Sequence, residues 1–297
     1  MHGFADDVLT TVEQHYAQGS LLEEIKKAFA CVGKDHRSLT SADLAVLDAF
    51  HLGGHQATIQ LARQIPMGPG LAILDVGCGL GGSCRYLAQT YGCTVLGIDL
   101  TEEYVSVASE LSAWTGCDNS VQFLKASALE MPVGDGRFDV VWTQHVQMNV
   151  SKKRELYREF ARVLKPRGVL LFHEVFLGSG EPVRYPVPWA SEKSISFLSA
   201  PREARDQIEA EGFVIEKWED VSERDAASLK KAGEIMGSTR HGPPLISMLL
   251  GADAASKLKN AMVNLSEGRI KVVQAVARRS DNACSHPGSS DWRSDEI

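Results

Sequence analysis

The spacing of apolar residues predicts a helical beginning to the chain, followed by alternating strands and helices. In the first 65 residues apolar side chains recur every three or four positions, as at Leu21, Leu22, Ile25 and Phe29, which is the period of an amphipathic helix. From Leu71 onward, short apolar runs alternate with helical segments. The predicted strands are Leu71–Val76, Thr94–Ile98, Val121–Leu124, Phe138–Trp142, Val169–Phe172, Val214–Trp218 and Ile270–Val276, and the predicted helices between the early strands are Ser83–Tyr91, Glu102–Thr115 and Lys152–Leu164.

Strands that alternate with helices through short connections build a parallel sheet with helices on both faces. We therefore predict an α/β fold with a doubly wound, mostly parallel, seven-stranded sheet. Residues 1–66 are predicted to form an N-terminal helical cap, and residues 67–280 the main domain, with cap inserts at 178–200 and 223–265. These helical cap additions are expected to lie over the carboxyl ends of the strands, where open α/β sheets bind ligands. Residues 281–297 are polar and are predicted to be a disordered tail.

Composition and charge narrow the range of partners. The chain has 31 Lys and Arg against 38 Asp and Glu, a net charge of −7, which predicts no general attraction to nucleic acid or to an anionic membrane. The first residues show no secretory signal pattern, and no apolar run approaches the roughly 18 residues that span a bilayer. Six cysteines without a C-x-x-C pair suggest neither a disulfide framework nor a zinc site. We expect a cytoplasmic protein without a metal site, either a monomer or a homodimer.

A glycine-rich turn after the first predicted strand is the most informative segment. It reads LDVGCGLGG over residues 74–82. Glycines allow a tight turn there and let a ligand approach the backbone before the next helix begins. Gly77, Gly79 and Gly82 also match the G-x-G-x-x-G pattern of dinucleotide-binding proteins, so the glycines alone do not identify the ligand.

Two acidic residues discriminate better between ligands. Asp75 lies two residues before the first glycine of the turn, where a carboxylate would repel a pyrophosphate but would suit an ammonium or sulfonium group. Asp99 follows the second strand, where an acid accepts hydrogen bonds from ribose hydroxyls. S-adenosylmethionine carries a ribose, an ammonium and a sulfonium but no phosphate, so we predict it as the cofactor. The alternative is that both acids cap helices and the glycines only turn the chain.

Four motifs in order resemble those of class I S-adenosylmethionine-dependent methyltransferases: LDVGCGLGG (74–82), GID (97–99), FDVVW (138–142) and VLKPRG (163–168). The resemblance covers residues 40–280 and implies a Rossmann-like fold. Where many family members have Lys-Pro-Gly-Gly, residues 165–168 read KPRG, and we predict a surface turn there that ends the preceding helix. More narrowly, three segments look like the sarcosine/dimethylglycine methyltransferase-like branch: DAFHLGG (48–54), QHVQMN (144–149) and PVPWA (186–190).

The resemblance implies a cofactor site at defined positions. The methionine end would be held by Asp75, Gly77 and Gly79, the ribose by Asp99, the adenine by Leu100, Ser127 and Ala128, and the cofactor would also be contacted by Tyr16 and Gln144. Tyr16 resembles the aromatic residue with which such enzymes cover the cofactor. Many family members carry Asp at the position of Ser127, whose hydroxyl is a weaker partner for the adenine amino group.

The chemistry of methyl transfer indicates which further residues matter. The reaction is an in-line displacement, so the protein must mainly align the acceptor with the methyl group and exclude water. An amine acceptor needs only to be unprotonated, whereas a hydroxyl or an acidic carbon also needs a base. His145 follows the fourth predicted strand, at the edge where the methyl group would point. It is our candidate for the general base or for an acceptor-orienting group; alternatively, it is a structural histidine.

The remaining candidates would contact the acceptor, and each has a structural alternative. His51 and His173 either face the site or belong to the core. Tyr185 and Trp189 either attract a methylated ammonium through cation–π contacts or wall an apolar pocket. Met148 either lines an adaptable pocket or packs in the core.

These observations predict methyl transfer from S-adenosylmethionine to a small-molecule acceptor, because three helical additions at one sheet edge favour an enclosed acceptor. Nitrogen is favoured as the accepting atom, as in a glycine-betaine-type amine, and the alternative is C- or O-methylation of a specialised metabolite. A second hypothesis is a nicotinamide-dependent oxidoreductase. Asp75 argues against it, because a carboxylate at that position would repel the pyrophosphate of the cofactor. A third is a catalytically silent protein that binds S-adenosylmethionine as a sensor or scaffold.

Overall fold

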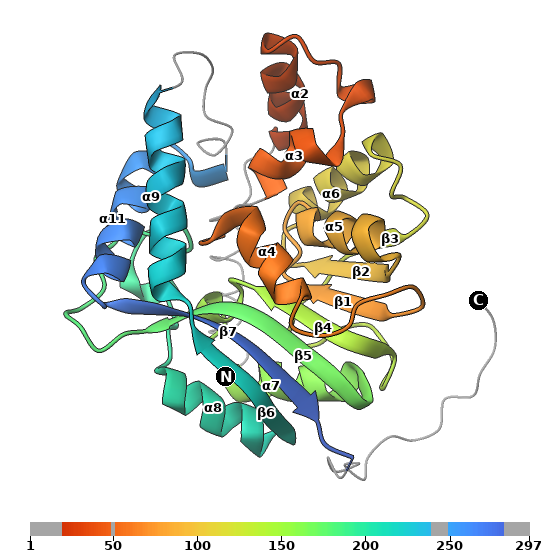
Figure 1. The fold of residues 1–297 in the computed structure, drawn as a ribbon, viewed down its shortest axis with the longest axis vertical. Helices are drawn as coiled ribbons and strands as arrows, with labels where there is room; N and C mark the ends of the chain where they lie inside the picture. Colours follow the sequence, from red (N-terminus) through yellow and green to blue (C-terminus); the bar gives the residue numbers. More distant parts are fainter. Residues whose placement is uncertain (1–19, 49–50, 239–248, 282–297) are drawn as a thin grey trace.

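Seven strands form one sheet in the computed structural model, which describes residues 20–48, 51–238 and 249–281. The order across the sheet is β3-β2-β1-β4-β5-β7-β6 (Figure 1). The strands are β1 Ala72–Val76, β2 Thr94–Asp99, β3 Val121–Lys125, β4 Phe138–Gln144, β5 Leu164–Leu177, β6 Phe213–Asp220 and β7 Ile270–Arg279.

The sheet is mostly parallel, as predicted. Strand β1 pairs in parallel with β2 and β4, β2 with β3, and β4 with β5, whereas β7 runs antiparallel between β5 and β6. In this register Val76 lies beside Ile98 on one side and Thr143 on the other. The carboxyl ends of β1, β2 and β4 therefore meet at one edge, which brings the glycine-rich turn and Asp99 close to the residues that follow β4.

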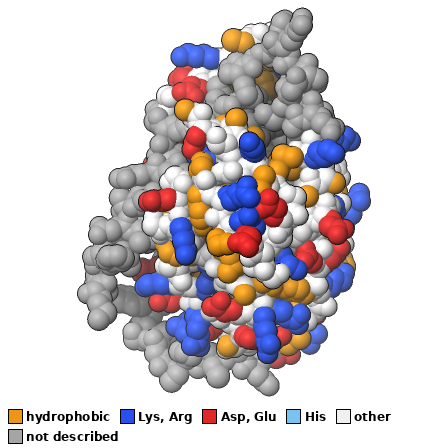
Figure 2. All heavy atoms as spheres, turned by 90° about the vertical axis from the view of Figure 1, so that its left-hand side faces the viewer, with side chains coloured by type: hydrophobic (Ala, Val, Ile, Leu, Met, Phe, Trp, Pro, Cys, Tyr) orange, Lys and Arg blue, Asp and Glu red, His pale blue; other side chains and the backbone are white. Residues whose placement is uncertain are grey.

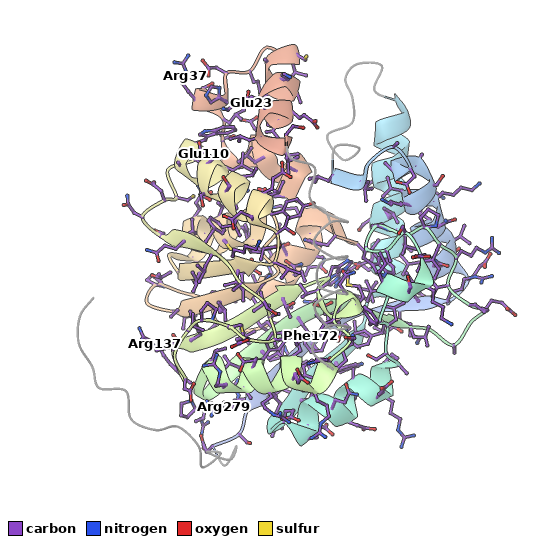
Figure 3. The ribbon with its side chains drawn as sticks, turned by 180° about the vertical axis from the view of Figure 1, so that it is seen from behind. Glu23, Arg37, Glu110, Arg137, Phe172 and Arg279 are labelled. Atoms are coloured by element: carbon purple, nitrogen blue, oxygen red, sulfur yellow. The ribbon has the colours of Figure 1, made fainter. Side chains whose placement is uncertain are left out.

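Helices cover both faces of the sheet, so the doubly wound α/β fold is confirmed. The helices are α2 Leu21–Cys31, α3 Ser41–Asp48, α4 Gly54–Ala62, α5 Gly82–Tyr91, α6 Glu102–Trp114, α7 Lys153–Val163, α8 Pro201–Ala210, α9 Ser222–Ser238 and α11 Ala254–Ser266, with short 3-10 turns η1 His36–Ser38, η2 Gln147–Asn149 and η3 Lys193–Ile195. One core contains residues of α7 and α8, and a second core on the opposite face contains residues of α4 and α5. Phe172 of β5 belongs to the first core (Figure 3).

Strand β5 is longer than the sequence predicts. Helix α7 ends at Val163 and β5 begins at once, at Leu164, rather than at Val169. In the pairing of β4 with β5, Phe138 faces Leu164 and Val140 faces Val169, so residues 165–168 form a bulge within the strand. The bulge accommodates the proline and a left-handed residue, Arg167, at φ 62°. The prediction of a separate surface turn at this segment was wrong.

Two of the predicted cap regions pack together beside the carboxyl edge. Helices α9 and α11 lie side by side (Figure 1), and a third core joins them to the segment before α8 through buried residues that include Val187, Trp189, Ala261 and Leu265. On the face that carries these helices, acidic and basic side chains are interspersed with small apolar areas (Figure 2). The division into a cap at 1–66 and a domain at 67–280 stays a prediction, and the predicted tail, beyond Asp281, lies outside the described residues.

The chain turns sharply where β4 ends, and a buried carboxylate holds the turn. His145 has a left-handed backbone, with φ 58°, which is strained for a residue with a side chain. Glu174 of β5, only 2% exposed, accepts hydrogen bonds from the backbone N–H of Val146 at 2.9 Å and of Gln147 at 3.2 Å. The hydroxyl of Thr143 donates to the same carboxylate at 2.9 Å. These bonds fix the direction in which the side chain of His145 leaves the sheet.

A buried lysine ties the same turn to the segment that precedes α8. The Nζ of Lys153 donates to the carbonyls of Gln147, Val150 and Phe197. The backbone N–H of Phe197 in turn donates to the carbonyl of Met148 at 2.7 Å. The turn and the segment therefore form one connected unit at the edge of the sheet.

The titration of Glu174 gives a test of this arrangement. Burial raises the pKa of Glu174 from its ordinary value of 4.5 to about 7. Ionisation therefore costs folding free energy, and the contribution of Glu174 to stability falls as the pH rises from about 4.5 through about 7. In Glu174→Gln this loss is absent. We predict that the stability of the variant relative to the wild type increases by about 1–3 kcal/mol between pH 5 and pH 8, measured by urea denaturation.

Glu174→Gln also loses one hydrogen-bond acceptor oxygen. This changes the free energy of unfolding by the same amount at every pH, so it does not affect the comparison between pH 5 and pH 8. Glu181→Gln, at an exposed position, is the matched control, and its stability relative to the wild type should not follow this dependence. A difference between Glu174→Gln and the wild type that is the same at both pH values would contradict a costly buried carboxylate at position 174.

Candidate functional site

A cavity of about 210 Å³ opens at the carboxyl edge of the sheet, between the turn after β1, the ends of β2 and β4, and the cap segments. The predicted site residues that line it are His51, Asp75, Gly77, Gly79, Asp99, Leu100, Ser127, Ala128, Gln144, His145, Met148 and Trp189. The parallel register of β1, β2 and β4 brings together the lining residues at the ends of these strands, which lie far apart along the chain.

The glycine-rich turn packs tightly against the turn that follows β4. The backbone N–H groups of Gly77 and Cys78 donate to the carbonyl of Ile98 at 2.8 and 3.0 Å. Gly77 has φ 71°, and a Cβ built on it would lie 2.2 Å from a methyl carbon of Val146, so only glycine fits. Gly79, with φ 54°, has open space where its Cβ would be, and a ligand in the cavity can approach its backbone.

Two carboxylates line the cavity beside this turn: Asp75 is buried, and Asp99 at the end of β2 is half-buried. The carboxylate of Asp99 accepts hydrogen bonds from the N–H of Gly79 at 3.0 Å and of Thr101 at 2.9 Å. Asp75 is 2% exposed and accepts a hydrogen bond from the thiol of Cys84 at 3.2 Å. Burial raises the pKa of Asp99, and it raises the pKa of Asp75 to about 7.

This pair of acids fits the predicted cofactor. No Lys or Arg within residues 20–48, 51–238 and 249–281 forms an ion pair with Asp75 or Asp99. A buried carboxylate without a cationic partner favours a ligand that carries positive charge, because the ligand offsets the cost of ionisation. An ammonium or sulfonium meets this requirement, and a pyrophosphate does not.

The far end of the cavity is formed by imidazole rings. His145 and His173 are stacked, with ring centroids 5.2 Å apart and planes 6° from parallel, and His51 lies 5.7 Å from His145. Burial, followed by the neighbouring His173, lowers the pKa of His145 well below its ordinary value and that of His51 to about 4. Both rings are therefore neutral near pH 7. The Nε2 of His145 is buried, and no hydrogen-bond partner for it lies in the described part of the chain.

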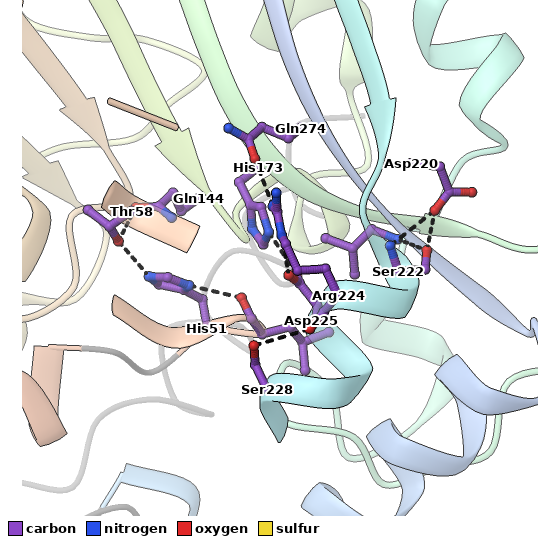
Figure 4. Close-up of polar contacts among 12 residues, drawn as sticks. His51, Thr58, Gln144, His173, Asp220, Ser222, Arg224, Asp225, Ser228 and Gln274 are labelled. Carbon is purple, nitrogen blue, oxygen red and sulfur yellow. Dashed lines mark hydrogen bonds and ion pairs between the residues drawn. The ribbon is translucent and has the colours of Figure 1, made fainter. Parts of the chain in front are cut away.

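Gln144 stands between the two ends of the cavity. Its side-chain oxygen accepts hydrogen bonds from the hydroxyl of Ser83 at 2.8 Å and from the indole N–H of Trp142 at 3.1 Å. Thr58 lies within 3.1 Å of both that oxygen and the Nε2 of His51 (Figure 4). The amide is thus held in one orientation, in which the described residues supply no partner for its NH₂ group.

Two of the predicted site residues that the structure describes, His173 and Tyr185, do not line the cavity. His173 is fully buried behind His145, where its Nε2 bonds to the carboxylate of Asp225 at 2.8 Å. Tyr185 packs against the core that joins α11 to the segment before α8. The prediction that these two side chains contact the acceptor is therefore not supported by the lining. Tyr16 lies outside the described residues.

Some cavity residues were missed by the sequence reasoning. Asp48, at the end of α3, lines the cavity and pairs with the fully buried Arg85 of α5; burial raises its pKa to about 6. Its position in the DAFHLGG segment was the available signal. Asn149 also lines the cavity and donates to the backbone carbonyl of Trp189 at 2.8 Å. Its position in the QHVQMN segment was the corresponding signal.

The described residues contain neither a membrane-spanning helix nor a cluster of metal ligands. No helix among them is long and apolar enough to cross a membrane. Within the same residues, no group of three or more His, Cys, Asp or Glu side chains is arranged to hold a metal ion.

Comparison with known proteins gives consistent matches. A family model described as a methyltransferase domain matches residues 74–172. A sarcosine/dimethylglycine N-methyltransferase from Halorhodospira halochloris is 30% identical over 220 residues, which cover 73% of this chain and 77% of that protein. A glycine/sarcosine/dimethylglycine N-methyltransferase from Actinopolyspora halophila is 27% identical over 210 residues, 70% of this chain but only 37% of that longer protein.

A solved structure of phosphoethanolamine N-methyltransferase 2 from Haemonchus contortus, in complex with S-adenosyl-L-methionine, shares the fold with a TM-score of 0.67. It is 20% identical, and the match covers 81% of this chain and 57% of that one. Other matching proteins include O- and C-methyltransferases, so the matches do not agree on the accepting atom. These matches agree with the fold and with the two carboxylates, Asp75 and Asp99, beside the glycine-rich turn. The chain belongs to the family of S-adenosylmethionine-dependent methyltransferases.

Proposed function

We propose that this protein transfers a methyl group from S-adenosylmethionine to a small-molecule acceptor bound beside His51 and His145. The observation that carries the proposal is the division of one cavity into two ends of different chemistry. The buried carboxylate of Asp75 at the glycine-rich turn suits the cationic methionine end of the cofactor, and the other end is lined by neutral imidazoles together with side chains such as Met148 and Trp189. The surrounding cap segments favour an acceptor small enough to be enclosed.

Each end of the cavity has a defined task in this proposal. Asp99 accepts hydrogen bonds from the ribose, and the turn from Asp75 to Gly79 holds the methionine end, while Ser127 and Leu100 contact the adenine. When bound, S-adenosylmethionine supplies a methyl group on a sulfonium, which is electrophilic enough for direct displacement. The protein aligns the acceptor with that methyl group and keeps water out of the cavity.

Nitrogen is the first candidate for the accepting atom. The relative that matches over most of its length is named as a sarcosine/dimethylglycine N-methyltransferase, which supports an amine acceptor of that general kind. An unprotonated amine already presents its lone pair, so the neutral imidazoles would only orient it.

One observation favours a second candidate, the methylation of a hydroxyl or an acidic carbon. His145 lines the cavity, its Nε2 has no partner among the described residues, and its lowered pKa keeps it unprotonated near pH 7. Such a ring is ready to take the proton that a hydroxyl or carbon acid must lose. Cytoplasmic location and a monomeric or homodimeric state stay predictions for either candidate.

We predict that Asp99→Ala weakens the binding of S-adenosylmethionine by about 30- to 1000-fold. Two hydrogen bonds from ribose hydroxyls to a carboxylate contribute about 2–4 kcal/mol together. Titration calorimetry with S-adenosylhomocysteine, which carries the same ribose, measures the effect. Asp118→Ala, at an exposed position, is the matched control. Unchanged affinity in a folded Asp99→Ala protein would remove Asp99 from the cofactor site, and binding of a nicotinamide dinucleotide in its place would favour an oxidoreductase.

We predict that His145→Ala lowers turnover by about 10²–10⁴-fold if the acceptor is a hydroxyl or an acidic carbon, the usual contribution of a general base. Cofactor affinity should change little. Because burial lowers the pKa of His145, turnover of the wild type should stay constant as the pH falls past the ordinary value of histidine, 6.5, and decline only at lower pH. With an amine acceptor the effect of the substitution should be smaller and should not follow the titration of a histidine.

A panel of amine, hydroxyl and carbon-acid acceptors, assayed across pH with the wild type and His145→Ala, separates these cases. His36→Ala, near Trp114 and away from the cavity lining, is the control. Wild-type turnover by His145→Ala at every pH would show that His145 is structural. Binding of the cofactor without methyl transfer to any acceptor of the panel would favour a sensor or scaffold.

A further inference from the structure

A buried acid from α9 reaches the histidines at the end of the cavity. The carboxylate of Asp225 is fully buried and its Oδ2 lies 2.8 Å from the Nε2 of His173 on β5. Figure 4 shows Asp225 directed from α9 toward the His173 ring, and His51 lies to the left of both in this view. The short distance makes Nε2 of His173 a donor to the carboxylate, which fixes the orientation of its ring.

The position of Asp225 is tightly constrained by its other neighbours. The Nε of Arg224 lies 3.5 Å from its Oδ1. On the opposite side, a Cβ built on Gly53, which has φ 80°, would lie 2.7 Å from the same oxygen. The segment that carries His51 therefore approaches the carboxylate so closely that only glycine fits. The acid sits where the N-terminal part of the chain, α9 and β5 converge.

His173 transmits this constraint to the cavity. Its ring stacks on that of His145, with centroids 5.2 Å apart and planes 6° from parallel. Its backbone carbonyl accepts the N–H of His145 at 3.0 Å. His173 does not line the cavity, so its contact with the site is made through two lining residues: it stacks on His145, and its ring lies 5.9 Å from that of His51 in a tilted arrangement.

We propose that Asp225 and His173 are positioning residues that hold the imidazole of His145 in the plane needed for methyl transfer. Asp225 fixes His173 by a hydrogen bond, and His173 fixes His145 by stacking. The charged and titratable groups near His145 come from different elements. They are His51 before α4, His173 and Glu174 on β5, and Asp225 beside Arg224 on α9. In this arrangement α9 contributes no described residue to the cavity lining, and it acts on the geometry of the reacting end through Asp225.

The inference rests on the proposed role of His145, and the variants are chosen to separate the two. Asp225→Asn keeps the shape of the side chain and an oxygen that accepts from Nε2 of His173, whereas Asp225→Ala removes the partner altogether. Loss of a residue that orients a reacting group commonly costs about 10–100-fold in activity. We expect Asp225→Ala to lower kcat by about that factor, Asp225→Asn to restore part of it, and both to bind S-adenosylhomocysteine within about twofold of the wild type.

The direct readout is nuclear magnetic resonance of the imidazole nitrogens, which needs neither cofactor nor acceptor. In the wild type the His173 resonances should report a proton on Nε2. In Asp225→Ala that preference should be lost and the His145 resonances, assigned by their absence from His145→Ala, should shift as well. Asp206→Ala, an exposed acid on α8, should shift neither ring. Thermal unfolding of each variant shows whether it is folded.

The outcomes are distinguishable. If His173 responds to Asp225→Ala and His145 does not, or if Asp225→Ala keeps the wild-type kcat, the proposal is wrong. If both rings respond while His145→Ala keeps full activity, the positioning contact exists but the proposed role of His145 fails. Equal loss of activity in Asp225→Asn and Asp225→Ala, with unchanged His145 resonances, would show that Asp225 acts only through stability.

Discussion

The carboxylate of Glu174 is the constraint on which the site depends. By accepting the N–H groups of Val146 and Gln147 it stabilises the turn that follows β4. That turn places His145 in the left-handed region, with its ring at the cavity, and presses Val146 against Gly77 of the other turn. One buried carboxylate on β5 therefore positions both the imidazole at the acceptor end and the wall of the cofactor end.

The charges within the cavity support the same division. Asp75 is a buried carboxylate whose ionisation is costly without a cationic partner, and S-adenosylmethionine carries positive charge. Burial also raises the pKa of the half-buried Asp99, and we propose that ribose hydroxyls donate hydrogen bonds to it. His51 and His145 are held neutral by burial, so the imidazoles add no positive charge next to a sulfonium. A site built in this way suits a cation at one end, and at the other it offers an acceptor neutral imidazoles beside Met148 and Trp189.

The sheet and the cofactor end were predictable from the sequence because their signals are local. Short apolar runs mark the strands, and the spacing of Asp75 and Asp99 around the glycine-rich turn reflects hydrogen-bonding needs within one βαβ unit. The bulge at residues 165–168 was not predictable, since its Lys-Pro-Arg-Gly segment reads equally well as a turn. The burial of Asp225 was not predictable for a different reason. Asp225 belongs to a helix with several charged residues, and only the tertiary structure reveals which of them is buried. The sequence leaves open whether His173 contacts the acceptor or belongs to the core, because it does not show which way a side chain near the end of a strand points; in the structure its ring is fully buried behind His145.

The central claim is that the carboxylates hold the cofactor and that His145 lies beside its sulfur, at the acceptor end of the same cavity. A crystal structure of the protein with S-adenosylhomocysteine tests this claim most directly. The account predicts that the ribose hydroxyls lie within hydrogen-bonding distance of Asp99, that the amino group lies next to Asp75, and that the sulfur points into the space beside His145. A complex in which the ribose lies away from Asp99, or in which the sulfur points away from His145, would contradict it.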